Sequence, residues 1–361
     1  MKPDSDACAR AAASRFAIDG ELQGVVAHHR GHIHDTLIST WRTASGETRF
    51  LHQRMNEGVF GDVNALMRNI AAVSRHLGAG GEAADGLVPL ELVPTRDGGN
   101  YLRADDGAWR CYRFIENAAS LDRCDGPARA REAARAFGAF QARLADLPAG
   151  ALTETIPQFF SGAARLAQLE RATADDTAGR RAGCVAELAF VEARRTLITE
   201  LERDVAAGVL PTRVVHGDTK LNNVLFDCDT GRAKCVVDLD TCMPAWSLYD
   251  FGDLVRFTAA TCAEDEPDAA GRADIDLALY REIAAGYLES AGAFLTEAEV
   301  AAMPRAARWV TLVIGVRFLT DHLCGDRYFK VARPDHNLAR ARVQLAMVAA
   351  MERVAEAMVV G

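Results

Sequence analysis

The chain has 361 residues, of which 49% are hydrophobic and 25% are charged, a composition typical of globular proteins. This length exceeds what one compact core usually holds, so we expect two lobes. The net charge of -9 and the lack of a Lys/Arg cluster argue against a nucleic-acid partner, and no apolar run predicts a membrane helix. Residues 1–16 lack the apolar stretch of a secretory signal, so a cytoplasmic location is expected.

The N-terminal part is expected to hold a small antiparallel sheet and one main helix. Residues 24–56 alternate apolar stretches with turn residues, which predicts strands. Asp62 is the expected cap of a helix whose apolar residues recur with helical spacing up to Leu77, before Gly78 ends it. The runs VPLELVPT and WRCYRFI are expected to complete the sheet. We therefore expect residues 1–115 to form the N-terminal lobe.

Ala-rich stretches with helical periodicity dominate the chain beyond about Asn117. Thr296 and Glu299 match a capping box and predict the start of one of these helices. Residues 116–361 are therefore expected to form a larger helical lobe. The whole chain is predicted to be an α+β protein with two lobes.

One β-rich segment, TRVVHGDTKLNNVLFDCDTGRAKCVVDLDT, interrupts the helices. Within it, VLFD and AKCVVD flank a turn and predict a hairpin. Asp218 precedes the first strand of this hairpin, Asn223 lies where that strand starts, and Asp238 lies where the second strand ends. Folding of the hairpin is therefore expected to bring these three residues together.

These residue types match the requirements of phosphoryl transfer. The reaction needs a carboxylate that deprotonates the attacking hydroxyl and oxygen ligands that hold Mg²⁺ on the phosphates. Asp218 and Asn223 are separated by five positions, as in the kinase loop H-R-D-x-x-x-x-N, with Gly217 in place of the Arg. We predict Asp218 as the catalytic base that binds the substrate hydroxyl, and Asn223 and Asp238 as metal ligands. Lys220 is expected either to reach the γ-phosphate or to be an exposed surface lysine.

Other polar residues near these positions have structural interpretations. His216 is expected to be a hydrogen-bonding residue of the loop rather than the base. Asp250-Phe251-Gly252 resembles the magnesium-binding motif of protein kinases, but it follows Pro244, outside the hairpin. Asp250 and Asp253 are therefore expected to fix the helix that begins there against the catalytic loop.

The nine cysteines include no C-x-x-C pair, which favours free thiols. Cys228, Cys235 and Cys242 recur every seven residues, a pattern that suggests zinc. They lack the paired spacing of zinc ligands, so we interpret them as buried thiols.

The segment HGDTKLNN followed by VVDLDT resembles the aminoglycoside phosphotransferase superfamily, which includes choline kinases and sugar kinases. Within it, GHIHDTLIST, FLHQRMNEGVF, MPAWSLYDFGDLVRF and RFLTDHLCGDRYFKVARPDHNLARAR are similar to the N-acetylhexosamine 1-kinase group. The resemblance covers about Gly31 to Gln344. It implies a bilobal protein-kinase-like fold, with a nucleotide-binding N-terminal lobe and a catalytic and substrate-binding C-terminal lobe.

The resemblance also implies a reaction. ATP and Mg²⁺ would be the cofactors, and the γ-phosphate would pass to the anomeric hydroxyl of an N-acetylhexosamine or related hexose, a step of carbohydrate metabolism. Two alternatives stay open. In the first, the acceptor would be an aminoglycoside, choline-type or other hydroxylated metabolite. In the second, the chain would bind nucleotide as a sensor without turnover.

Roles in nucleotide binding follow from the same resemblance. Asp218 would be the base, Asn223 and Asp238 would bind Mg²⁺, and a hinge would contact adenine through Arg113, Phe114, Ile115 and Glu116. Asp240 points to the same side of an extended strand as Asp238 and is a further candidate metal ligand.

The chain departs from protein kinases in the cation that holds the α- and β-phosphates. The strand TRFLHQRM has no lysine, so Arg54 is the candidate cation, and Asn69 is its candidate partner on the helix. His34-Asp35-Thr36 stands where the sugar kinases tend to show Asn-Asp-Thr, and its role on the phosphate side or the sugar side stays open.

Four residues of RFLTDHLCGDRYF are candidate sugar contacts, because polar groups and an aromatic ring suit a hydroxyl-rich ligand: Arg317, Asp321, His322 and Tyr328. The alternative is a surface role beside an apolar helix face formed by Phe318, Leu319 and Leu323.

Overall fold

The computed structural model describes residues 10–28, 33–79, 85–266 and 271–360. They form two compact units. The first comprises Met1–Ala119, Asp146–Ile156 and Leu225–Met243, and the second comprises Ser120–Ala145, Pro157–Val224 and Pro244–Gly361. This division differs from the expected boundary after residue 115, because two later segments pack with the N-terminal residues. Gly31 and most of the stretch tested for a secretory signal lie outside the described residues.

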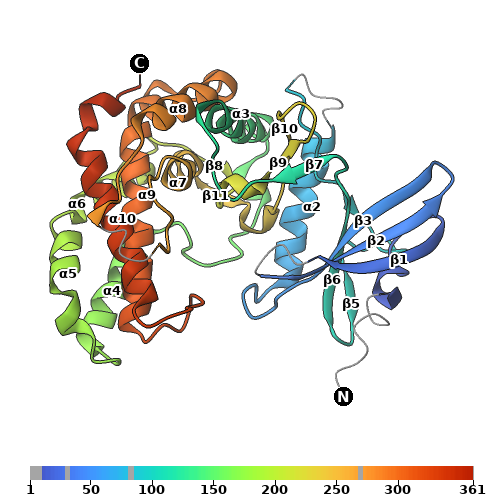
Figure 1. Ribbon diagram of the computed structural model, residues 1–361, viewed down its shortest axis with the longest axis horizontal. Helices are drawn as coiled ribbons and strands as arrows, with labels where there is room; N and C mark the ends of the chain where they lie inside the picture. Colours follow the sequence, from blue (N-terminus) through green and yellow to red (C-terminus); the bar gives the residue numbers. More distant parts are fainter. Residues whose placement is uncertain (1–9, 29–32, 80–84, 267–270, 361) are drawn as a thin grey trace. The chain divides into compact units, whose positions relative to one another are not determined.

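A six-stranded sheet dominates the first unit (Figure 1). Its order is β1 (Glu21–His28), β2 (Asp35–Thr43), β3 (Gly46–Arg54), β6 (Gly107–Arg113) and β4 (Leu92–Val93), with β5 (Leu102–Ala104) paired to β6. All neighbours are antiparallel, which confirms the strands predicted in residues 24–56. The run VPLELVPT forms only the short β4, because Pro89 and Pro94 have no N–H for a strand ladder.

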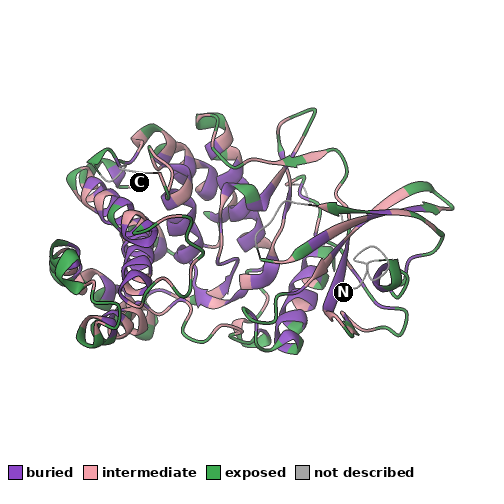
Figure 2. Ribbon diagram, turned by 60° about the horizontal axis from the view of Figure 1, so that its bottom comes forward, coloured by how far each residue is buried: buried purple, intermediate pink, exposed green. Residues whose placement is uncertain are grey.

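Alternate residues of the strands build the core of this unit. Trp41, Phe50, Trp109 and Cys111 are buried in one cluster with Phe16 from the preceding segment, and Figure 2 shows the buried residues in purple.

The predicted helix forms α2 (Val63–Ala79). The Oδ1 of Asp62 accepts a hydrogen bond from the backbone N–H of Ala65 at 2.9 Å, so the expected cap is confirmed. The apolar residues with helical spacing, including Leu66, Ile70 and Leu77, are buried.

The predicted hairpin is also present. β9 (Val224–Asp227) pairs with β10 (Ala233–Val236), and β7 (Ala118–Ser120) pairs with the other edge of β9. The Oδ1 of Asp227 accepts hydrogen bonds from the backbone N–H and the hydroxyl of Thr230, both at 3.0 Å, which closes the turn. The pairing with β7 explains why the hairpin belongs to the first unit.

The second unit is mainly helical, as predicted. Its helices are α3 (Pro127–Arg143), α4 (Gly162–Asp175), α5 (Val185–Glu192), α6 (Arg195–Ala206), α7 (Leu248–Thr258), α8 (Leu277–Ala291), α9 (Glu297–Leu323) and α10 (His336–Arg353). A two-stranded sheet joins β8 (Thr212–Val215) to β11 (Met243–Trp246). Within the described ranges, no helix combines the length and apolar character needed to cross a membrane.

Local signals explain two features of this helical unit. Thr296 and Glu299 exchange both hydrogen bonds of the predicted capping box at the start of α9. Gly138 lets α3 approach α8, because a Cβ at this position would lie 2.7 Å from the carbonyl oxygen of Tyr287. The structure therefore confirms the predicted α+β class, with a small antiparallel sheet in the first unit and mainly helices in the second.

Candidate active site

The loop between β8 and β9, residues 216–223, carries the predicted base and is called the catalytic loop here. The backbone N–H groups of His216 and Gly217 donate to the two carboxylate oxygens of Asp250, each at 2.8 Å. The backbone N–H of Thr219 donates to Asp253 at 3.0 Å. The prediction that Asp250 and Asp253 hold this loop is therefore confirmed. Gly217 has a φ of 81°. Glycine adopts this left-handed conformation without strain, which explains why a glycine stands where the kinase motif has Arg.

His216, the first residue of the catalytic loop, is fully buried. Its ring lies edge-on to the rings of Phe137 and Phe140, with centroids 5.3 and 5.5 Å away. Its Nδ1 accepts a hydrogen bond from the backbone N–H of Asp218 at 3.3 Å. These contacts agree with the structural role expected for His216.

The Asp218 carboxylate has two side-chain partners on the same loop. Its Oδ2 accepts hydrogen bonds from Lys220 Nζ at 2.9 Å and from Asn223 Nδ2 at 3.2 Å. Burial acts to raise the pKa of the Asp218 carboxyl, but the charge and hydrogen bond of Lys220 outweigh it, so this pKa lies below its ordinary value. The side chain is 23% exposed. Asp218 is thus an ionised, accessible carboxylate at neutral pH.

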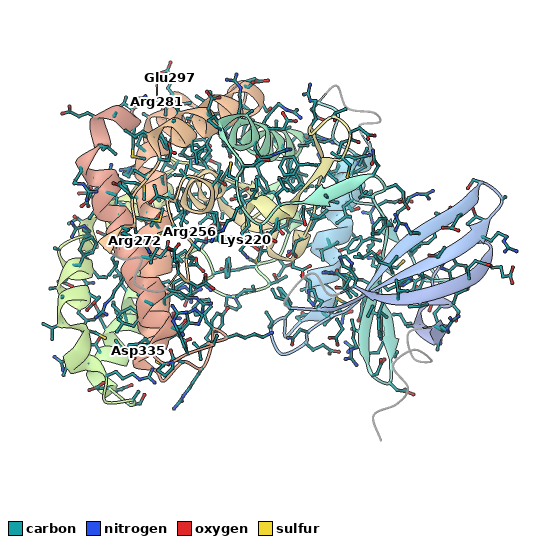
Figure 3. The ribbon with its side chains drawn as sticks, in the orientation of Figure 1. Lys220, Arg256, Arg272, Arg281, Glu297 and Asp335 are labelled. Carbon is teal, nitrogen blue, oxygen red and sulfur yellow. The ribbon has the colours of Figure 1, made fainter. Side chains whose placement is uncertain are left out.

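Lys220 lies at the edge of a pocket of about 370 Å³. Its Nζ lies 5.6 Å from the ring centroid of Phe257, which also packs against the guanidinium of Arg256 at 3.8 Å. Arg256 is neutralised by Asp253 and Glu264. Figure 3 labels Lys220 and Arg256 in the second unit. The lysine is therefore fixed on the catalytic loop rather than being an isolated surface cation.

The predicted metal ligands present oxygen donors, which Mg²⁺ prefers. Asn223 uses its Nδ2 to donate to the backbone oxygen of Asp218 at 2.8 Å and to the Asp218 carboxylate, which leaves its Oδ1 as an acceptor. Asp238 lies in the first unit and adopts the left-handed backbone conformation, with φ of 63° and ψ of 65°. The donor chemistry of both residues fits Mg²⁺.

The zinc alternative gains no support from the described part of the chain, in which no group of three or more His, Cys, Asp or Glu could hold a metal ion. Cys235 and Cys242 are buried, as predicted. The prediction is wrong for Cys228, which is exposed because it lies in the hairpin turn.

Asp240 and Arg54 both have protein partners in the first unit. The Asp240 carboxylate forms a two-point ion pair with Arg110 and accepts a hydrogen bond from His34. These partners indicate a structural role for Asp240, and its role as a metal ligand stays a prediction. Arg54 pairs with the carboxylate of Asp35, and its role at the phosphates stays a prediction.

Sequence reasoning missed Arg110. Its side chain is only 2% exposed, although it lies within the apolar run WRCYRFI. An arginine in a buried strand needs a charged partner, and that expectation was the available signal.

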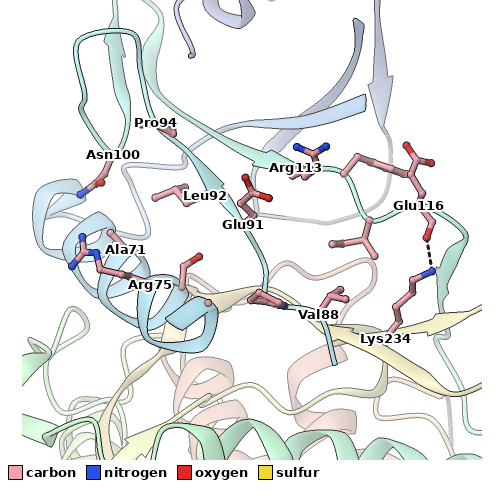
Figure 4. A pocket seen from close by; sticks show the side chains of 15 residues that line it. Ala71, Arg75, Val88, Glu91, Leu92, Pro94, Asn100, Arg113, Glu116 and Lys234 are labelled. Atoms are coloured by element: carbon pink, nitrogen blue, oxygen red, sulfur yellow. Dashed lines mark hydrogen bonds between the residues drawn. The ribbon is translucent and has the colours of Figure 1, made fainter. Parts of the chain in front are cut away.

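The four predicted hinge residues line one pocket of about 710 Å³ in the first unit (Figure 4). Residues of α2, such as Ala71 and Arg75, and of β4 form its other walls. Lys234 Nζ donates to the backbone oxygen of Glu116 at 2.9 Å. The guanidinium of Arg49 lies 4.3 Å from the ring centroid of Phe114 and also bonds the Glu116 carboxylate. The hinge is thus held in place beside an open pocket.

Arg317 lies among aromatic rings of the second unit. Its guanidinium carbon is 5.1, 5.8 and 5.4 Å from the ring centroids of Phe159, Tyr328 and Phe329. Within the described ranges, the guanidinium of Arg317 forms no hydrogen bond or ion pair with the protein. Tyr328 is 65% exposed. These side chains form a partly open cationic and aromatic surface, called the Arg317 surface here.

The other two candidate sugar contacts have structural partners. The Asp321 carboxylate accepts hydrogen bonds from the backbone N–H groups of Arg327, Tyr328 and Phe329 and from the side chain of Asn337. These four bonds occupy its oxygens, so we correct its expected role from sugar contact to organiser of the loop that carries Tyr328. His322 is buried.

Tyr249 was also missed. It is 3% exposed, and burial, followed by the charge of Asp253, raises the pKa of its hydroxyl. Its ring packs edge-on against the rings of Phe160, Trp246 and Trp309. The position of this tyrosine directly before Asp250 in the sequence was the signal that could have identified it.

Comparison with solved structures supports the fold. A microcompartment-associated aminopropanol kinase matches with a TM-score of 0.58 and 18% identity, over 98% of this chain and 99% of that chain. A spectinomycin phosphotransferase in complex with ADP and spectinomycin matches with a TM-score of 0.57 and 12% identity, over 96% and 98%. Choline kinase from Cryptosporidium parvum Iowa II matches with a TM-score of 0.59 and 12% identity, over 98% and 97%.

The sequence profile described as "Phosphotransferase enzyme family" matches residues 32–293. This range contains the catalytic loop, the hairpin and the hinge, and it covers well over half of the chain. The chain belongs to the phosphotransferase enzyme family.

Proposed function

We propose that this phosphotransferase moves the γ-phosphate of ATP to the anomeric hydroxyl of an N-acetylhexosamine or a related hexose, giving the sugar 1-phosphate. The observation that carries the reaction is the geometry of Asp218. Its carboxylate is accessible, and Lys220 keeps it ionised through a 2.9 Å hydrogen bond. Its second oxygen, Oδ1, accepts no hydrogen bond from the described residues and is the atom that takes the proton of the attacking hydroxyl.

The catalytic loop is organised for this proton transfer. Asp250 and Asp253 hold the backbone on both sides of Asp218, so the carboxylate is positioned before the substrate binds. Lys220 stabilises negative charge that develops during transfer. Mg²⁺ held by Asn223 and Asp238 would neutralise charge on the phosphates.

The hinge pocket is the proposed adenine site. Arg113, Phe114, Ile115 and Glu116 line it, and a pocket with apolar walls and a few fixed polar groups suits a planar base. The contacts of Glu116 with Arg49 and Lys234 fix the hinge backbone, which lowers the entropic cost of binding.

The Arg317 surface favours an acceptor without positive charge. Among the described residues, Arg317 has no carboxylate partner, and the side chain of Arg165 donates hydrogen bonds only to the neutral Gln168 side chain and the Phe159 carbonyl. A cationic acceptor such as choline or an aminoglycoside would be repelled by these guanidinium groups. An N-acetylhexosamine offers a carbonyl and hydroxyl oxygens that Arg317 can bind, and a sugar ring that packs on Tyr328.

Phosphorus NMR of the purified protein with ATP and Mg²⁺ tests this proposal. N-acetylglucosamine, N-acetylgalactosamine, galactose, choline and kanamycin are added in turn. A new anomeric phosphate signal with a hexosamine is the expected result. ADP formation only with choline or kanamycin would overturn the sugar assignment and the argument from Arg317. Nucleotide binding without turnover of any acceptor would favour the sensor alternative.

The variant Asp218→Asn tests the base. Loss of a general base lowers the rate by roughly 100- to 10,000-fold, so activity within about tenfold of the wild type would rule out this assignment. ADP binding serves as the control, because the substitution leaves the hinge pocket intact.

A further inference from the structure

The turn that begins at Asp238 has an unusual backbone. Asp238 has a φ of 63°, and Leu239–Thr241 continues as a single 3-10 turn. A left-handed conformation at a residue other than glycine costs free energy and persists only where surrounding contacts hold it. Residues 238–242, called the Asp238 turn, therefore need anchors elsewhere in the first unit.

The first anchor is a buried ion pair. Asp240 is 3% exposed, and its Oδ1 and Oδ2 accept hydrogen bonds from the two terminal nitrogens of Arg110 on β6. Arg110 also donates from Nε to Gln53 Oε1 on β3, at 2.9 Å. Such a two-point guanidinium–carboxylate contact fixes orientation as well as distance.

Arg110 itself is enclosed. All three of its nitrogens have protein partners, and the side chain is 2% exposed. An arginine that reached nucleotide phosphates would present free N–H groups to an open site. Arg110 is therefore an anchor of the Asp238 turn.

The second anchor is His34 in the segment before β2. Its Nε2 lies 2.5 Å from Asp240 Oδ2, and its Nδ1 accepts a hydrogen bond from the backbone N–H of Asn56 at 3.0 Å. Because Nδ1 is an acceptor, Nε2 carries the proton and donates to Asp240.

The third anchor holds the far end of the turn. Asn69 on α2 is 3% exposed, and its Nδ2 donates to the backbone oxygen of Cys242 at 3.2 Å and to that of Thr153 at 2.7 Å. Its Oδ1 accepts the backbone N–H of Thr153 at 3.0 Å. The Asp238 turn is thus tied to the sheet and to the helix.

We propose that Arg110, His34, Asn69 and Asp240 form a clamp that positions Asp238 for Mg²⁺. This inference rests on the proposed function, because it takes Asp238 as the ligand. The clamp residues are positioning residues and touch neither metal nor substrate. Loss of such supporting contacts typically weakens metal binding by roughly 10- to 100-fold.

Calorimetric titration of ADP, with excess Mn²⁺ and separately with EDTA, tests the clamp without relying on turnover. In Asp240→Asn, the Kd for ADP in Mn²⁺ is expected to rise by about tenfold or more, while the Kd in EDTA stays within about twofold. Electron paramagnetic resonance of Mn²⁺ with ADP should show the same loss of affinity. Arg103→Lys, which alters an exposed ion pair with Glu57 in the same sheet, is the matched control and should match the wild type.

A second variant controls for the possibility that Asp240→Asn misfolds. Replacing a buried ion pair by apolar residues of similar volume often preserves stability, so Arg110→Met combined with Asp240→Met should fold and show the same selective loss. Asn69→Ala removes the third anchor without touching the ion pair and should also weaken Mn²⁺ binding.

Three results would overturn the clamp. One is unchanged Mn²⁺ affinity in the folded variants. Another is an equal loss of ADP affinity in Mn²⁺ and in EDTA, which would place the damage in the nucleotide pocket. The third is one fewer Mn²⁺ bound per chain in Asp240→Asn, which would make Asp240 a ligand. If the wild type shows no metal-dependent ADP binding, the proposed function itself fails, and the clamp with it.

Discussion

The carboxylate of Asp250 accepts a 2.8 Å hydrogen bond from the backbone N–H of His216, two residues before the proposed base. The same carboxylate binds Gly217 N–H and the amide of Gln141. Asp250 is fully buried, and burial raises the pKa of its carboxyl. A helix that starts beside the catalytic loop thus fixes the backbone of that loop.

The first prediction concerns this contact. In Asp250→Asn, an amide NH₂ replaces one carboxylate oxygen, so one loop N–H loses its acceptor. We expect the free energy of unfolding to fall by about 1–3 kcal/mol and kcat to fall by roughly tenfold or more as Asp218 loses its position. Urea unfolding and steady-state kinetics measure both. Glu289→Gln on the surface of α8 is the matched control, and equal effects in the two variants would contradict the prediction.

The second prediction concerns Lys220. The carboxylate form of Asp218 is the active base, so kcat/KM falls as pH drops through its pKa. Since Lys220 holds that pKa below its ordinary value, Lys220→Met is expected to move the acid limb of the kcat/KM profile to higher pH. The rate at neutral pH should fall on the order of 100-fold as a charge-stabilising donor is lost. An acid limb that stays in place would show that Asp218 is not the titrating base.

The third prediction concerns the Arg317 surface. Arg317→Met keeps the volume of the side chain but removes its donors. We expect KM for the acceptor to rise by about 10- to 100-fold, as a site built for hydrogen bonds loses them, while KM for ATP does not change. A variant that gains activity toward choline would support charge exclusion by Arg317. Unchanged KM values for every acceptor would remove this surface from the substrate site.

The fourth prediction concerns His52 in the core of the first unit. Burial lowers the pKa of His52 to about 4, and no described residue is hydrogen bonded to its Nδ1. The unfolded chain takes up this proton near pH 6.5, whereas the folded chain resists it until about pH 4. Stability should therefore fall by up to about 3 kcal/mol between pH 7 and pH 4.

Urea unfolding of the wild type and of His52→Gln across this pH range measures the effect. The variant should be less stable at pH 7, because it disturbs the bond to Ser39, but its stability should depend less on pH. Identical pH dependence in both proteins would assign the effect to other groups.

Local features of the chain were predictable from the residue pattern alone. The spacing of Asp218 and Asn223, the turn of the hairpin and the capping box at Thr296 depend on residues a few positions apart, whose conformations follow from local hydrogen bonds and backbone preferences. The structural role of Asp250 was also predicted, because its position outside the hairpin excluded it from the expected metal site.

Contacts between residues that are distant in the chain could be identified only from the folded structure. Arg110 and Asp240 are 130 positions apart, and His34 and Asp240 are 206 apart, so no local pattern joins them. The loop role of Asp321 depends on backbone N–H groups that every residue except proline supplies, so the sequence pattern does not reveal it. These contacts exist because burial of a charged or polar group requires a partner, and the fold alone determines which one comes within reach.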